Sequence, residues 1–197
     1  RRKTGTQNAF IPIGNEGIMK LANASFRELS SMLAMRQHWN YWESIAQTLG
    51  NAGIGTKDSV AAQALIDYMS RNDDGGPQSE DTVTGKVYAP LALGKIGGEE
   101  ANRMLQRCIE RDGAEQFLAG WINTQAVGYF HGDRASLLAT FRGNCAQGLV
   151  FTGEESNIRL VEQTLEALDA ELAANPHYST PLGSTQDTRT REDKVQE

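Results

Sequence analysis

Several features that would assign a function directly are missing from this 197-residue sequence. Its two cysteines are too few for a disulfide scaffold and lack the CxxC spacing of a metal or redox site. The histidines (His38, His131 and His177) are isolated, and neither an HExxH motif nor an EF-hand loop occurs, so we expect no metal and no other cofactor. No apolar run approaches the roughly 20 residues that a membrane-spanning helix needs, so no span is predicted.

An excess of positive charge is also missing. The chain has 19 Lys and Arg against 25 Asp and Glu, a net charge of −6, and an isoelectric point near 5.2. Nucleic-acid-binding proteins normally carry a basic face, so this balance argues against a nucleic-acid partner, including the DNA-repair class of helical-repeat proteins. Hydrophobic residues make up 39% and charged residues 22%, which predicts an acidic, soluble, globular protein.

The two cysteines each lie on a predicted apolar stripe. Cys108 belongs to the helical pattern at 99–110, and Cys145 lies in a second apolar segment. Buried cysteines commonly behave as small hydrophobic residues. We therefore expect buried free thiols, with a single disulfide between them as the alternative.

The chain divides into three parts. Residues 1–10 are polar and are predicted to be a flexible lead-in, and residues 176–197 are predicted to be a disordered polar tail because they offer almost nothing apolar to bury. Between them, 11–175 show helical periodicity and no alternating strand pattern, which predicts an all-α fold. Residues 71–84, with a Gly-Gly-Pro breaker, are predicted to be a surface loop. The periodic segments are 16–35, 57–70, 99–110 and 154–174, the last with an apolar stripe at Ile158, Val161, Leu165, Leu168 and Leu172.

An internal repeat is the strongest signal in the sequence. Ile-Gly pairs occur at 13–14, 54–55 and 96–97, with spacings of 41 and 42 residues, and Thr152-Gly153 is a degenerate fourth copy. Three of these turns follow a second glycine at the end of an apolar helix. A glycine can end a helix in the left-handed conformation at little steric cost, and a polar residue then opens the next helix. We expect an apolar residue of the turn (Ile54, Ile96 or Val150) to be tucked under each helix pair.

The strings Leu-Gly-Asn-Ala-Gly-Ile-Gly-Thr-Lys-Asp-Ser-Val and Ala-Leu-Gly-Lys-Ile-Gly-Gly-Glu-Glu-Ala resemble HEAT-like repeats of the type first noted in phycobilin lyases. The resemblance covers roughly residues 11–174, with 112–133 as an insertion that contains one more helix. It implies a right-handed α-solenoid of about three to four helix pairs. The first unit keeps only its turn and second helix, which predicts a section of a larger solenoid chain or an open end that another element caps.

The resemblance also implies which surface binds a partner. In HEAT-like arrays the second helices usually line the concave side, where extended surfaces bind proteins or peptides. We therefore expect a non-catalytic scaffold or adaptor for protein–protein interaction. Its groove would be lined by Gln63, Asp67, Arg103, Arg107, Arg159 and Glu162.

Small-ligand binding is the alternative function. The phycobilin-lyase likeness suggests a tetrapyrrole or lipid ligand, or a lyase-like activity, and such a ligand would need an apolar pocket. An aromatic patch of Trp39, Tyr41, Trp121 and Tyr129 is the candidate lining, whereas Trp42 fits the buried face of its helix. No catalytic residue is assigned, because His131 and Asp133 lack a nucleophile or third partner and Asp133 suits a helix N-cap.

Overall fold

The computed structural model describes residues 26–71, 80–121 and 134–174. These residues form helices and connecting turns and contain no strand, which confirms the all-α prediction. No helix among them is both long and apolar enough to cross a bilayer. The predictions for 1–10 and 176–197 concern residues outside the described part. The elements are α2 (Phe26–Ala34), η1 (Arg36–Tyr41), α3 (Trp42–Ala52), α4 (Ser59–Ser70), α5 (Glu80–Ile96), α6 (Glu99–Ile109), α7 (Arg111–Trp121), α8 (Arg134–Phe151), η3 (Glu155–Asn157) and α9 (Ile158–Ala173).

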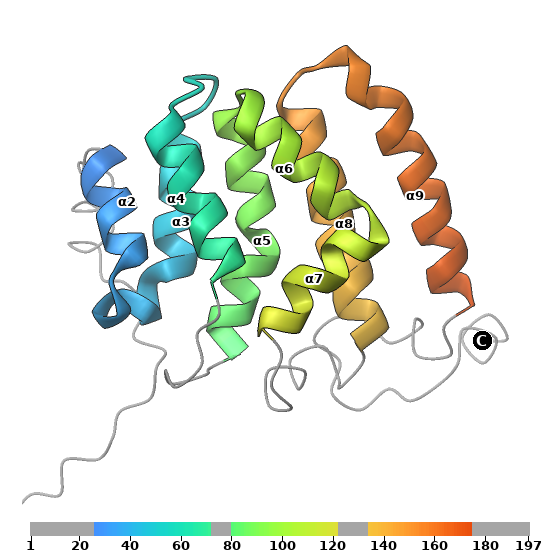
Figure 1. The fold of residues 1–197 in the computed structure, drawn as a ribbon, viewed down its shortest axis with the longest axis horizontal. Helices are drawn as coiled ribbons and strands as arrows, with labels where there is room; N and C mark the ends of the chain where they lie inside the picture. The colour runs from blue at the N-terminus through green and yellow to red at the C-terminus, as the bar shows by residue number, and fades with distance from the viewer. Residues whose placement is uncertain (1–25, 72–79, 122–133, 175–197) are drawn as a thin grey trace, which may run out of the picture.

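The helices pack in two layers (Figure 1). Helices α3, α5 and α8 lie side by side in one layer, while α2, α4 and α6 lie side by side in the other and cover them. The insertion contributes α7, which packs on α6 and α8, and α9 packs on α8. Each layer presents its apolar side chains to the other, so the core lies between them. Its most deeply buried members include Leu29, Ile45, Leu49, Leu65, Tyr68, Leu93, Ile96 and Phe141.

Glycines in the left-handed conformation make the turns that follow α3, α5 and α8. Gly55 follows α3 with φ of 69°, Gly97 follows α5 with φ of 73°, and Gly153 follows α8 with φ of 71°. This confirms the predicted glycine turns at 54–55, 96–97 and 152–153, because side chains with a Cβ rarely adopt these angles, while the turn predicted at 13–14 lies outside the described residues. The first two turns are also joined, since the Gly55 amide donates to the Lys95 carbonyl at 2.8 Å. Asp58 then caps α4 by accepting from the Ala61 amide at 2.8 Å.

The earlier glycine of each pair has a different role from the turn glycines. Gly50, Gly94 and Gly148 lie inside helices, where they allow neighbouring helices of the α3–α5–α8 layer to touch. A Cβ on Gly50 would come within 2.5 Å of the Ala92 Cα, and one on Gly148 within 2.6 Å of the Pro90 carbonyl oxygen. A Cβ on Gly94 would overlap the backbone of Gly148. The repeated glycine pair therefore combines a helix-packing position with a turn position.

Three predictions about local structure are wrong. Residues 80–84 are not part of a loop but begin α5, because Val83 and Thr84 are buried there against the rest of the fold. Ile54 and Val150 are 64% and 59% exposed, because their turns project away from the core and only Ile96 is fully buried.

The apolar stripe predicted for 154–174 is only partly buried. Val161 and Leu168 enter the core, but Ile158 and Leu165 are 56% and 47% exposed. Helix α9 packs mainly on α8 and η3, so the described structure covers only one side of the stripe.

Candidate functional site

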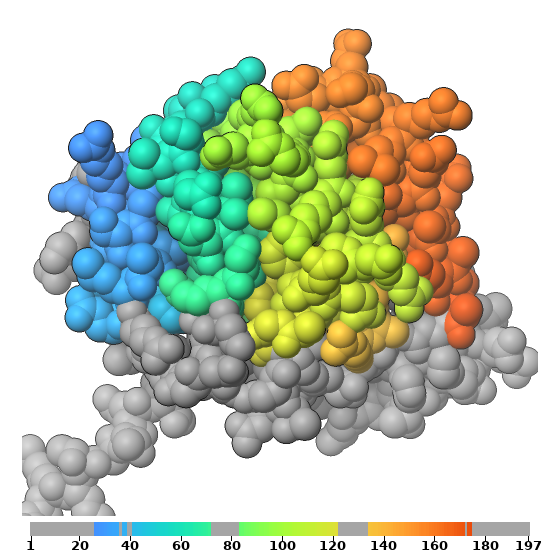
Figure 2. Space-filling model, viewed as in Figure 1, coloured from blue at the N-terminus to red at the C-terminus, as the bar shows by residue number. Residues whose placement is uncertain are grey.

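The six residues predicted to line a binding surface are all exposed. They lie on three helices that present their outer sides on the same face (Figure 2). Helices α4 and α6 are in contact, and α6 is joined to η3, which leads into α9. The set is Gln63 and Asp67 on α4, Arg103 and Arg107 on α6, and Arg159 and Glu162 on α9.

Local pairs along each helix hold several of these side chains. The Gln63 amide donates to the Asp67 carboxylate at 2.7 Å, and the Arg103 guanidinium donates to Glu99 at 2.7 Å. Exposed pairs one helical turn apart contribute only about 0.3–0.5 kcal/mol, so a partner can replace them at little cost. Arg107 is more constrained, because it donates to Gln116 at 2.6 Å and lies over the Phe117 ring.

A buried polar bridge fixes the position of η3 and the start of α9 relative to α6. Asn157 is 2% exposed and accepts from the Gln106 amide at 2.9 Å. The Asn157 amide also donates to the Asn102 side-chain oxygen at 2.6 Å. These bonds satisfy a buried amide and join the two elements that carry the C-terminal half of the exposed face.

The described aromatic residues of the predicted patch do not form an open pocket. Trp121 is 7% exposed, its indole N–H donates to the Met69 carbonyl at 2.6 Å, and its ring packs edge-on against Phe141. Tyr41 is half-buried and packs against the core. The side chain of Trp39 and all of Tyr129 lie outside the described residues. Trp42 is buried, as predicted.

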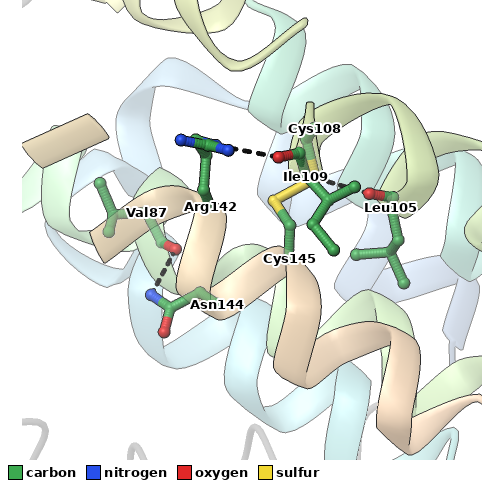
Figure 3. The surroundings of a disulfide bond; sticks show 7 residues. All are labelled: Val87, Leu105, Cys108, Ile109, Arg142, Asn144 and Cys145. Carbon is green, nitrogen blue, oxygen red and sulfur yellow. Dashed lines mark hydrogen bonds between the residues drawn. A yellow bond between two sulfur atoms is a disulfide. The ribbon is translucent and has the colours of Figure 1, made fainter. Parts of the chain in front are cut away.

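Helix α8 carries a cluster that sequence reasoning missed, and Figure 3 shows its geometry. A disulfide joins Cys108 on α6 to Cys145 on α8, so the expectation of free thiols is wrong and its alternative is confirmed. The stripes that placed both cysteines in the core also place them opposite each other, with Cα atoms 6.0 Å apart. The Asn144 amide donates to the Val87 carbonyl at 2.8 Å, close to Pro90, which interrupts the hydrogen bonding of α5.

Arg142 adds a buried charge to the same cluster. Its side chain is 7% exposed, its Nε donates to the Ile109 carbonyl at 2.9 Å, and its guanidinium pairs with Glu171 on α9 at 2.9 Å. Together these contacts tie α8 to α5, α6 and α9. A sequence signal exists, because Arg-Gly-Asn-Cys at 142–145 places two polar side chains between the apolar residues Phe141 and Ala146.

A small pocket lies in the α3–α5–α8 layer, between α3 and α5. It has a volume of about 160 Å³ and a floor of small residues that includes Ala46, Gly85 and Ala92. Gln47, Asn51 and Lys95 supply polar groups at its rim, and the Lys95 ammonium donates to the Asn51 side chain at 2.7 Å. Typical small-molecule sites occupy about 300–1000 Å³, so this pocket is smaller than the usual site of a drug-sized ligand.

No metal centre is formed within the part of the chain that the structure describes, since no three His, Cys, Asp or Glu side chains converge there. His131 and Asp133 lie outside that part.

Comparison with protein-family models, with curated proteins and with solved structures finds no match to this chain. The surface that remains as a candidate is the exposed face of α4, α6 and α9.

Proposed function

We propose that the protein is a non-catalytic scaffold that binds a protein or peptide along the exposed face of α4, α6 and α9. The observation that carries this proposal is the arrangement of the six predicted residues, which lie exposed on three linked helices. Side chains of both charges lie on that face, and exposed charges of this kind select a partner by complementarity. The described residues contain no group of three His, Cys, Asp or Glu side chains that could hold a catalytic metal ion.

We further propose that the two layers are a right-handed HEAT-like α-solenoid. Its support is a burial pattern that recurs in the outer helices. In each of α4, α6 and the η3–α9 segment, three residues at positions i, i+4 and i+7 are buried. These triplets are Ala61, Leu65 and Tyr68, then Ala101, Leu105 and Cys108, then Asn157, Val161 and Thr164. Repeats that stack in this manner create the extended surfaces used for partner binding.

A tetrapyrrole or lipid ligand receives no support from a described residue. Trp121, the tryptophan of the aromatic patch whose side chain the structure describes, fills the core and donates its indole N–H to a backbone carbonyl. The α3–α5 pocket has about 160 Å³, which is too small for a tetrapyrrole.

The test is a binding experiment with the full chain immobilised and an extract of the source cells as the partner supply. A double variant, Asp67→Arg with Arg103→Glu, reverses two exposed charges on α4 and α6 and keeps the net charge at −6. Gln47→Arg, on the exposed side of α3 in the other layer, is the matched control.

We expect a stoichiometric partner to be retained by the unmodified chain and by the control, and lost from the double variant. All three proteins should have the same melting temperature, because the changed side chains are exposed. Retention of every partner by the double variant, or no stoichiometric partner at all, contradicts the proposal.

A further inference from the structure

Helix α9 has an exposed face that includes Glu162 of the candidate surface and is distinct from the core face that packs on α8. This face consists of Ile158, Glu162, Leu165 and Asp169, spaced so that all four lie along one side of the helix. We call this set the α9 stripe. Ile158 and Leu165 are 56% and 47% exposed, although both are large and apolar.

The repeating pattern of burial shows what the α9 stripe corresponds to in the other outer helices. The positions that follow each buried triplet by one residue lie on the adjoining side of each helix, which in α6 is the side that hydrogen-bonds to η3. In α4 these positions are Ala62, Ile66 and Met69, in α6 they are Asn102, Gln106 and Ile109, and in α9 they are Ile158, Glu162 and Leu165.

In the first two helices these positions are covered. Ala62 and Met69 of α4 are 2% and 0% exposed. In α6, Asn102 and Gln106 hydrogen-bond to Asn157, which belongs to the following unit. In α9, by contrast, two of the three positions, Ile158 and Leu165, carry large apolar side chains that are exposed. Helix α9 therefore has the surface of a helix onto which a further helix packs.

The charges on and beside the α9 stripe define the chemistry of that further helix. From Glu154 to Ala170 the exposed charged side chains are Glu154, Glu155, Arg159, Glu162, Glu166 and Asp169, five of them acidic and one basic. Glu162 and Asp169 alternate with the two apolar residues and form no ion pair with another described residue. An apolar stripe that is interrupted by carboxylates fits a helix whose own apolar positions are flanked by Lys or Arg.

We propose that the α9 stripe binds a basic amphipathic helix of a partner protein, which packs on α9 as a further helix of the stack. The inference rests on the proposed interaction function and adds the chemistry of one partner segment. Its failure is distinguishable from failure of the scaffold, because the scaffold test changes residues on α4 and α6 that the α9 stripe does not include.

The probe is a synthetic amphipathic peptide of about 18 residues, long enough to form a helix, with leucines at i, i+4, i+7 and i+11 and lysines beside them. A second peptide has the same leucines and glutamates in place of the lysines. Binding of each fluorescently labelled peptide to the full chain is measured by anisotropy at low and moderate salt.

We expect the lysine peptide to bind at least about tenfold more tightly than the glutamate peptide, with a preference that declines as salt increases. The double variant Glu162→Lys with Asp169→Lys should reverse the preference. Ile158→Asp with Leu165→Asp should abolish binding of both peptides. The matched control, Gln163→Asp with Ala167→Asp, changes exposed residues on other sides of α9 and should retain lysine-peptide binding within about threefold.

Equal affinity for the two peptides, no binding of the lysine peptide, or loss of binding in the control variant overturns the proposal. Sedimentation of the chain alone provides a further test. If the chain forms dimers that Ile158→Asp with Leu165→Asp abolishes, the occupant of the α9 stripe is a second copy and the basic-helix proposal is wrong.

Discussion

At the scale of single residues, glycine positions control how closely the inner helices pack. Gly94 of α5 lies directly against the backbone of Gly148 of α8, so a methyl group at position 94 has no space. Gly143, which is also helical and also lies on α8, has nothing within 4 Å of its missing Cβ. Substitution at position 94 therefore tests the role of glycine in helix packing, whereas substitution at position 143 tests only the lower stability of a helix that contains glycine.

We predict that Gly94→Ala lowers the free energy of unfolding by about 1–3 kcal/mol, because α5 and α8 must move apart. Gly143→Ala, the matched control, should raise it by about 0.5–1 kcal/mol, because alanine favours a helix and meets no neighbour there. Urea denaturation followed by circular dichroism measures both. A change of the same sign and size in the two variants would show that the close approach of α5 and α8 does not matter.

The sequence predicted the turn glycines but not the packing glycines. Gly55, Gly97 and Gly153 follow from local rules, because a helix that stops at a glycine commonly does so in the left-handed region. Gly50 and Gly94 depend on which helix lies opposite, and those contacts, with Ala92 and Gly148, join residues 42 and 54 positions apart. The recurring pair of glycines was visible in the sequence, but the role of its first member could not be predicted from neighbouring residues.

At the scale of elements, α8 is the helix that side-chain bonds join to its neighbours in several places. It contacts α5, α6, α7 and α9, and its disulfide, Asn144 and Arg142 reach three of them. The disulfide joins α6 to α8 across a sequence separation of 37 residues, which includes all of α7. Closing a loop of this length restricts the unfolded chain considerably.

We predict that removing the disulfide lowers the free energy of unfolding by about 4 kcal/mol, the value that loop-closure entropy gives for a loop of this size. Guanidinium denaturation with and without a dithiol reductant measures the effect. A double variant, Cys108→Ala with Cys145→Ala, serves as a control that should be insensitive to the reductant. Two free thiols in the unfolded, unreduced protein, or a denaturation midpoint that reductant leaves unchanged, would contradict the prediction.

Boundaries of individual helices were predictable where capping and periodicity agree. The prediction of 99–110 matches α6 within a residue, because Gly98 precedes two glutamates that favour the first turn of a helix. The start of α5 was missed, since Glu80 to Thr84 carry no apolar stripe and are helical because the fold buries Val83 and Thr84. The exposure of the six site residues followed from periodicity, but the burial of Trp121 depends on the long-range contact with Met69.

At the scale of the whole molecule, the two layers leave one helix with few neighbours. Helix α5 packs against α3, α4, α6 and α8, so it is enclosed on several sides. Helix α9 packs mainly on α8 and η3, and much of its surface, including Ile158 and Leu165, is exposed. In stacked helical proteins each unit is stabilised by its direct neighbours, so a helix with fewer neighbours opens at a lower free energy.

We therefore predict that amides of α9, from Ile158 to Ala173, exchange with deuterium at least about tenfold faster than those of α5 and α8. A tenfold difference corresponds to about 1.4 kcal/mol of opening free energy. Native-state hydrogen exchange with mass spectrometry measures the rates, and α3 provides an internal control because it packs closely on α5 through Gly50. Adding the lysine peptide should slow exchange in α9 and leave α3 unchanged, because the peptide covers the α9 stripe. Equal rates in α9, α5 and α8 without peptide would contradict this prediction, since α9 would then unfold only together with the rest of the protein.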